Sequence, residues 1–195
     1  MILYFDTETT GLRPGNICQI SYIMQTKSEV RCKNFFFSVD YVEIGALNVH
    51  GFSVEKLRDL SNGNVFSDRI EEIKRDFESA DLVVAHNLSF DMMFLREEFL
   101  RQNQTLYIKN EMCSMKQTTP VCKILGKRGY KYPKLSELTD YLGVTNSEII
   151  SNCEKLFNSL TGFHDARFDC TALYLAMQKL LVNGCLKQEL SRFLI

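Results

Sequence analysis

The sequence has few of the residues that break a chain into separate units. Only 3 prolines and 10 glycines occur among its 195 residues, and they do not gather into a linker, a repeat or a low-complexity tract. A chain of this length can bury a sizeable core in one unit. We therefore expect a single domain over residues 1–183, with a C-terminal tail over residues 184–195 that packs on the domain or trails from it.

Membrane and secretion signals are also lacking. No apolar run approaches the length of a transmembrane helix, and the N-terminal stretch MILYFDTETTG has no basic segment of the kind that begins a signal peptide. The 7 cysteines form no CxxC pair and no zinc-like Cys/His spacing. We interpret them as reduced thiols and expect a cytoplasmic protein with no membrane partner.

Positive and negative charges nearly balance, because the formal net charge is −1 at pH 7. A basic surface is the usual mark of a protein that binds nucleic acid or an acidic membrane, and the overall composition does not show one. Bound cations would change this balance, so the net charge alone excludes no polyanionic substrate.

Apolar patterns predict a fold that mixes strands and helices. Three β-rich segments come first, and their short connections suit antiparallel neighbours. They span residues 2–5, 17–24 and 34–40. Helical and strand patterns then alternate, which points to an α/β or mixed α+β sandwich. The pattern predicts a strand at 81–86 and helices at 53–60, 66–77, 89–102, 134–143, 146–160 and from 165.

Asp6 and Glu8 are the first feature with chemical meaning, in the stretch YFDTETTGL. Because side chains alternate along a strand, both carboxylates lie on one face. Two adjacent like charges repel each other, and a cation between them would relieve the repulsion. Hard oxygen ligands suit Mg²⁺ or Mn²⁺. The alternative interpretation is a solvated strand end that enters a turn.

Asp91 is the second feature, in the stretch DLVVAHNLSFDMMFL. It is an acidic residue among apolar ones near the start of a predicted helix. A functional carboxylate and a partner for the helix dipole are both consistent with this position. His86 and Asn87 end the preceding strand, where polar residues also form turns.

Asp169 and His164 are the third feature, in the stretch TGFHDARFDCTALYLAMQKLL. In a helix from 165, Asp169 falls on an apolar stripe, where an uncompensated carboxylate is costly. The stripe comprises Ala166, Ala172, Leu173, Ala176 and Leu180. His164 can converge with Asp169 only from the loop before the helix, with Asp165 as a possible N-cap. A purely structural histidine is the alternative.

The order of these features resembles the DEDDh group of 3′-to-5′ exonucleases in the ribonuclease-H-like superfamily. That group includes the proofreading epsilon subunit of bacterial replicative DNA polymerase and ribonuclease T. The matching stretches are FDTETTGL (5–12), VVAHNLSFDMMFL (83–95) and HDARFDCTALYL (164–175). The resemblance implies an α/β fold with a central five-stranded mixed sheet flanked by helices.

The resemblance also implies a mechanism and a set of substrate contacts. Two divalent cations, Mg²⁺ or Mn²⁺, would be held by Asp6, Glu8, Asp91 and Asp169, while His164 would be the general base that deprotonates water. The terminal nucleotide would contact Thr9, Thr10, Gly11, Leu12, His50, Phe52 and Asn87. Without the resemblance, these residues fit a strand-ending turn and core packing equally well.

Two further segments carry weaker signals. Residues 123–135 interleave basic and aromatic side chains, as a binding site for a single strand would, or form a solvated loop. The possible strand contacts are Lys127, Arg128, Tyr130, Lys131 and Tyr132. The C-terminal KQELSRFLI loosely resembles peptides that bind sliding clamps, but we expect a frayed tail.

Together these features predict a 3′-to-5′ exonuclease that releases nucleoside 5′-monophosphates from single-stranded or frayed DNA ends. Nucleic acid would be its substrate, and a polymerase or another replication or repair protein would be its partner. An exonuclease that trims RNA 3′ ends is the alternative. A catalytically inactive nucleic-acid-binding protein is the distant alternative.

Overall fold

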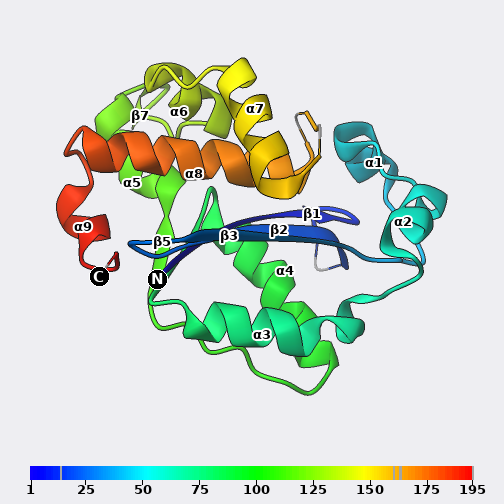
Figure 1. Ribbon diagram of the computed structural model, residues 1–195. Helices are drawn as coiled ribbons and strands as arrows, with labels where there is room; N and C mark the ends of the chain where they lie inside the picture. Colours follow the sequence, from blue (N-terminus) through cyan, green and yellow to red (C-terminus); the bar gives the residue numbers. More distant parts are fainter. Residues whose placement is uncertain (14, 160, 163, 195) are drawn as a thin grey trace.

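A five-stranded mixed sheet forms the centre of the computed structural model, which describes residues 1–13, 15–159, 161–162 and 164–194. The sheet order is β3-β2-β1-β4-β5 (Figure 1). The first three strands are antiparallel neighbours, and β4 and β5 continue the sheet in parallel. This confirms the predicted sheet. The strands are β1 (Ile2–Thr9), β2 (Ile17–Gln25), β3 (Val30–Phe36), β4 (Leu82–Ala85) and β5 (Glu111–Cys113).

Helices cover both faces of the sheet (Figure 1). One face carries α3 (Ile70–Ser79) and α4 (Leu88–Arg101). The long helix α8 (Ala166–Val182) crosses the other face. Alongside it lie α5 (Ser114–Cys122), α6 (Leu135–Tyr141) and α7 (Asn146–Phe157).

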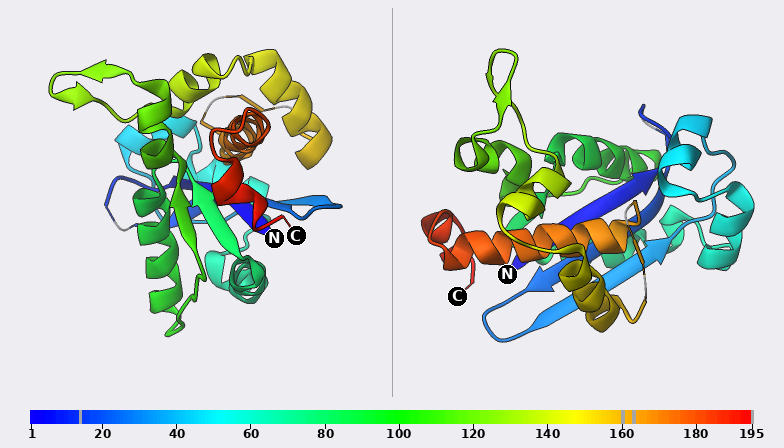
Figure 2. Two further views of the ribbon diagram at one scale, coloured as in Figure 1. Left: turned by 90° about the vertical axis from the view of Figure 1, so that its left-hand side faces the viewer. Right: turned by 90° about the horizontal axis from the view of Figure 1, so that it is seen from above.

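Shorter elements complete the architecture. At one end of the sheet lie α1 (Ile44–His50) and α2 (Val54–Ser61), and a 3₁₀ turn, η1 (Phe66–Asp68), precedes α3. A hairpin of β6 (Leu125–Gly126) and β7 (Gly129–Tyr130) projects from the body (Figure 2). The last helix is α9 (Lys187–Ser191). Among the described residues, no helix combines the length and the apolar character that crossing a membrane would require.

Alternation along β1 divides the core into two halves. Leu3 and Phe5 belong to the cluster under α3 and α4, whereas Ile2 and Tyr4 belong to the cluster under α8. Because side chains on a strand alternate with period two, the next even-numbered residues also face α8. The strand that builds the core therefore presents Asp6 and Glu8 toward the helix that carries Asp169.

One predicted strand needs correction, and several short elements were not predicted. The third strand was expected at 34–40 but spans Val30–Phe36, because a turn in which Thr26 N donates to Glu29 O pairs Gln25 directly with Val30. Polar side chains interrupt the first five residues of this edge strand, VRCKN, so only its apolar end was recognised as a strand. The short strand β5 and the helices α1 and α5 were not predicted. Strand β5 has only three residues, and Pro120 lies inside α5.

The C-terminal segment packs on the domain instead of fraying. Leu190 in α9 is 0% exposed and joins the cluster under α8. The amino group of Met1 donates to the Asp81 carboxylate (2.6 Å) and to the carbonyl of Phe193 (3.0 Å). The apolar side chains that prompted the comparison with clamp-binding peptides are thus engaged within the chain.

We expect Leu190→Ala to lower the free energy of unfolding by about 2–5 kcal/mol, because it removes a fully buried side chain. Urea titration followed by circular dichroism would measure the change. Val182→Ala is the control: Val182 is apolar and 82% exposed at the end of α8, so its loss should change stability little. Equal stability of the two variants would contradict the packing of the tail.

Candidate active site

Three carboxylates converge where β1 ends and α8 begins. Asp6 and Glu8 lie on the face of β1 that α8 covers, and Asp169 lies in the first turn of α8. One oxygen from each can be chosen so that all three lie within 4.8 Å of one another. The sheet and the helix thus bring together residues that are more than 160 positions apart in the sequence.

Asp91 approaches these three carboxylates from the other side of the sheet, and its charge is near enough to raise the pKa of Asp6. It lies in the first turn of α4 and is only 3% exposed. Its Oδ1 accepts hydrogen bonds from Thr7 Oγ1 (2.8 Å) and from Thr7 N (3.2 Å). Thr7 stands between Asp6 and Glu8 on β1, so the strand that carries two carboxylates also orients a third.

Burial disfavours the charged forms of all four groups, and the charges of neighbouring carboxylates add to this effect at Asp6 and Glu8. Burial, then the charges of Asp91, Asp169 and Glu8, hold the pKa of Asp6 well above its usual value, and the pKa of Glu8 is raised in the same way. Burial raises the pKa of Asp91 and that of Asp169 to about 7. The apoprotein therefore holds a site with excess negative potential.

The donor set fits a divalent cation. Among the described residues, no lysine or arginine forms an ion pair with any of the four carboxylates. Carboxylate oxygens are the ligands that hard divalent ions prefer. Buried carboxylates that lack a protein cation are stable only if protons or metal ions compensate them.

His164 lies in a bend just before α8, as expected for a residue that meets Asp169 from a loop. Its side chain is exposed and lines a cavity of about 540 Å³ together with Asp6 and Asp169. The backbone of His164 acts to lower the pKa of Asp169, against the effect of burial. The φ angle of His164 is 60°, a left-handed conformation that costs a residue with a side chain about 1 kcal/mol.

A second cavity, of about 310 Å³, lies beside Glu8 between the end of β1 and α1. Four of the predicted substrate contacts line it: Thr9, Gly11, Leu12 and His50. Gly11 lies against the carboxylate of Glu43, an exposed side chain that would have to move aside for a Cβ at this position. Val49 and Phe90 add apolar surface, and no basic side chain other than His50 contributes to the lining.

The hydrogen bonds of His50 assign its tautomer. Its Nδ1 accepts from Phe52 N (3.0 Å), so its Nε2 carries the proton and donates to the carbonyl of Thr9 (3.2 Å). Burial lowers the pKa of His50. A neutral, fixed imidazole therefore ties α1 to the end of β1 and forms part of the wall of the smaller cavity.

Three of the predicted substrate contacts are placed elsewhere. Thr10 is buried, and its Oγ1 accepts from Asn16 N (3.0 Å), so it closes the loop after β1. Phe52 is 5% exposed and packs on the His50 ring with centroids 5.1 Å apart. Asn87 caps α4 with a left-handed φ of 69° and lines neither cavity. These residues support the site and do not form its walls.

The side chains of the basic segment, residues 123–135, lie in different surroundings in the structure. Lys127 and Arg128 lie in the turn of the projecting hairpin, and Tyr130 and Tyr132 are exposed. Lys131 is neutralised by Glu137, with Nζ 2.6 Å from Oε2, so it is less available to a phosphate group than predicted.

Lys134 and His86 both line the larger cavity. Lys134 belongs to the basic segment 123–135 but was not among the predicted strand contacts, and sequence reasoning underestimated His86. The His86 ring contacts Ser114 Oγ (2.9 Å) and the carbonyl of Pro133 (3.0 Å). It thus fixes the residue before Lys134. The signal in the sequence was only a histidine after a buried strand, which has many structural uses.

Comparison with known proteins shows which chains share these features. A family model described as "Exonuclease" matches residues 3–177. The chain is 29% identical to the DNA polymerase III subunit epsilon of Buchnera aphidicola, over 98% of this chain and 86% of that protein. It is 25% identical to the PolC-type DNA polymerase III of Bacillus subtilis over 94% of this chain, but it spans only 12% of that protein.

Solved structures share the fold. An exonuclease X in complex with 5′ overhanging duplex DNA superimposes with a TM-score of 0.63 and 19% identity, covering 94% of this chain and 93% of that one. The nuclease domain of 3′hExo, a DEDDh family member bound to rAMP, gives a TM-score of 0.62 and 11% identity, covering 94% and 92%.

The raised pKa values predict how stability depends on pH. The pKa of Asp91 and that of Asp169 are about 7 in the folded protein and about 4 in an unfolded chain. The folded apoprotein binds more protons in this window, so its free energy of unfolding falls as the pH rises through it. Without divalent cations, we expect Asp6→Asn to raise the melting temperature near neutral pH.

Differential scanning calorimetry with and without Mn²⁺ would measure this effect. Mn²⁺ should raise the melting temperature of the wild-type protein near neutral pH and should raise it much less in Asp6→Asn. Asp59→Asn, an exposed site on α2, is the matched control. If Asp6→Asn destabilises the apoprotein or keeps the full response to Mn²⁺, the four-carboxylate site is not a cation site.

Proposed function

Because the chain belongs to the exonuclease family, it is a 3′-to-5′ exonuclease that acts on nucleic acid, and we propose that its substrate is a DNA 3′ end. It would release nucleoside 5′-monophosphates with the help of two divalent cations. One observation carries this proposal: the carboxylate cluster stands between a small, largely apolar cavity and a larger, open one.

The smaller cavity suits the terminal nucleoside. Leu12, Val49 and Phe90 offer apolar surface for a base, and its volume of about 310 Å³ is at the lower end of ligand sites. It offers no lysine or arginine to a phosphate. The scissile phosphate would therefore remain outside this cavity, beside the carboxylates. Leu12 is 82% exposed and free to pack against a base at the rim.

Asp6, Glu8, Asp91 and Asp169 would hold the cations, and exonucleases of this family generally use divalent metal ions. When bound, two such ions stabilise the attacking and the leaving oxygen of a phosphoryl transfer. We propose Mg²⁺ or Mn²⁺, which favour oxygen ligands. Thr7 would keep Asp91 oriented for this role through its two hydrogen bonds.

His164 would act as the general base. It lines the same cavity as Asp6 and Asp169, and imidazole can take a proton from water near neutral pH. His50 and Thr9 would hold the wall of the nucleoside cavity, since their hydrogen bond joins α1 to β1. Proton transfer and nucleoside binding would thus use different walls of the site.

The sequence relatives also suggest a partner. The Buchnera aphidicola protein is named as a subunit of DNA polymerase III, and the matching part of the Bacillus subtilis protein is a small portion of a PolC-type polymerase. We propose that this chain, with residues 1–183 as its catalytic unit, works beside a DNA polymerase or another replication or repair protein.

The substrate is tested with matched 5′-labelled DNA and RNA oligonucleotides in Mg²⁺ and in Mn²⁺. We expect stepwise shortening from the 3′ end, faster for single-stranded DNA and for a mismatched duplex end than for a paired one. Asp6→Ala and Asp169→Ala should abolish shortening, since each removes a cation ligand.

Asp59→Ala serves as the matched control for these two variants. Faster decay of RNA would replace DNA by RNA as the substrate. Absence of hydrolysis on both polymers with either cation would favour an inactive binding protein. Near-normal activity of Asp6→Ala would contradict the cation assignment.

The larger cavity suits the strand on the other side of the scissile phosphate. It runs from Asp6 and Asp169 to the start of α6, where Lys134 and Ser136 lie. Lys134 is exposed, and in the described part of the chain no carboxylate forms an ion pair with it, unlike Lys131. A lysine in this position can neutralise a strand phosphate.

We therefore expect Lys134→Ala to raise KM for a DNA oligonucleotide about 3- to 10-fold. The slope of the logarithm of the binding constant against the logarithm of the salt concentration should fall by the contribution of about one phosphate contact. Hydrolysis of thymidine 5′-monophosphate p-nitrophenyl ester should not change, because this substrate has no upstream nucleotide. Lys27→Ala, in the turn between β2 and β3, is the control. Equal loss on both substrates would contradict a strand contact.

A further inference from the structure

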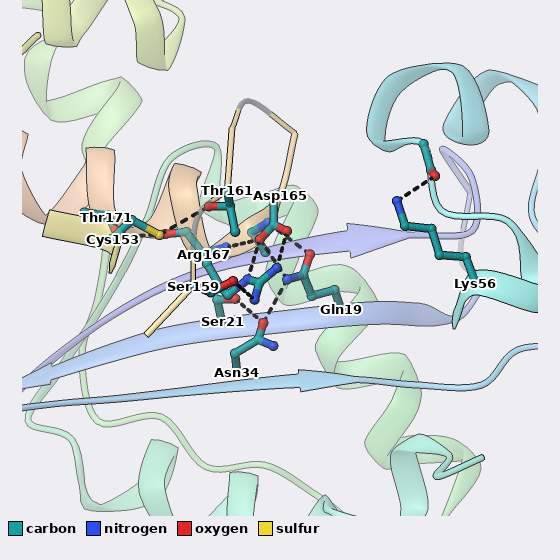
Figure 3. Close-up of polar contacts among 12 residues, drawn as sticks. Gln19, Ser21, Asn34, Lys56, Cys153, Ser159, Thr161, Asp165, Arg167 and Thr171 are labelled. Atoms are coloured by element: carbon teal, nitrogen blue, oxygen red, sulfur yellow. Dashed lines mark hydrogen bonds and ion pairs between the residues drawn. The ribbon is translucent and has the colours of Figure 1, made fainter. Parts of the chain in front are cut away.

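The segment that carries His164 is anchored by side chains outside the carboxylate cluster. His164 holds a left-handed backbone conformation, which side-chain-bearing residues keep only where their surroundings impose it. The residues around it are fixed at several points (Figure 3). Thr161 Oγ1 lies 3.3 Å from Cys153 Sγ on α7, and Asp165 caps the start of α8.

Arg167 makes most of these anchoring contacts. Its Nε and Nη2 donate to the two oxygens of Asp165 at 2.9 and 2.7 Å, and its Nη1 donates to Ser159 Oγ at 2.7 Å. Its guanidinium also lies over the Phe36 ring, 5.3 Å from the centroid. One planar group thus joins both ends of the segment from Ser159 to Asp165, and His164 lies inside that span.

The sheet fixes the other side of this anchor. Gln19, fully buried on β2 opposite Glu8, donates through Nε2 to Asp165 (3.0 Å) and to Asn34 (2.8 Å). Its Oε1 accepts from Ala166 N (3.1 Å). Both ends of the Gln19 amide are therefore used, and Asp165 cannot shift without breaking a buried hydrogen bond.

We propose that Arg167 is a positioning residue for the general base: it clamps Asp165 and Ser159 so that the imidazole of His164 faces the cation site. This rests on the proposed role of His164. Arg167 touches neither cavity, so it does not act on substrate directly. The bidentate geometry requires a guanidinium, because an ammonium group cannot donate to both oxygens of Asp165 and to Ser159 in one plane.

A capping or stability role alone would predict a different outcome. Asp165 Oδ1 also accepts from the backbone N–H of Arg167 (3.0 Å), a contact that survives substitution of the side chain. If Arg167 only stabilised the fold, its substitution would lower the melting temperature and the fraction of active enzyme equally with His164 present or replaced. Loss of positioning would lower kcat only while His164 is present.

The test is a double-mutant cycle of Arg167→Met with His164→Ala, measured as kcat and KM on a single-stranded DNA oligonucleotide at a temperature where all variants are folded. His164→Ala should lower kcat about 100-fold or more. Arg167→Met should lower kcat about 10- to 100-fold with little change in KM. In the His164→Ala background, Arg167→Met should cost less than about 2-fold.

Two more variants complete the comparison. Arg167→Lys should recover only part of kcat. Arg31→Met removes an exposed guanidinium near the start of β3 that is bidentate to Glu29 at 2.7 Å, and it should leave kcat unchanged. The rise in melting temperature on adding Mn²⁺ should persist in Arg167→Met, because the four carboxylates remain.

The outcomes separate the two proposals. If His164→Ala retains normal kcat, the general-base assignment fails. If His164→Ala is impaired but Arg167→Met is harmless or fully additive with it, the positioning role of Arg167 is wrong. If Arg167→Met does not fold, Ser159→Ala removes only the contact to Ser159 Oγ. That variant should then lower kcat, again only when His164 is present, and an unchanged kcat would overturn the proposal.

Discussion

Repulsion among buried carboxylates is the constraint on which the rest of this structure depends. Asp6, Glu8, Asp91 and Asp169 are held together although burial and their mutual charge disfavour ionisation. A cluster of this kind would spread apart on a pliable scaffold. It stays together because its members lie on a central strand and in the first turns of two helices that pack on that strand. The packing of the helices on the sheet therefore offsets the free-energy cost of holding the four carboxylates together.

The parts around the cluster divide the work of the site. Thr7 orients a carboxylate from the sheet, His50 joins a wall of the smaller cavity to the same strand, and Arg167 with Gln19 fixes the start of α8. Each uses a side chain whose hydrogen-bond partners lie within the protein, so these supports do not depend on contacts with substrate.

Local periodicity made the central features predictable. Period two places Asp6 and Glu8 on one face, and period 3.6 places Asp169 on the packing face of its helix, which the buried neighbours Ala166, Ala172 and Leu173 bear out. The approach of Asp91 to the other carboxylates could not be derived from periodicity, since it depends on how α4 packs on the sheet. The same limit applies to Thr10 and Phe52: a motif gives their position in the chain, but tertiary packing decides which way each side chain faces. Strand β5 was too short to show any period.

Asp91 comes from the α4 side of the sheet, and this has a consequence for the partly folded chain. Asp6, Glu8 and Asp169 need only α8 to dock, whereas Asp91 needs the separate cluster under α4, with Met92 and Phe94, to form as well. The four carboxylates therefore stand together only when both layers of helices are packed on the sheet.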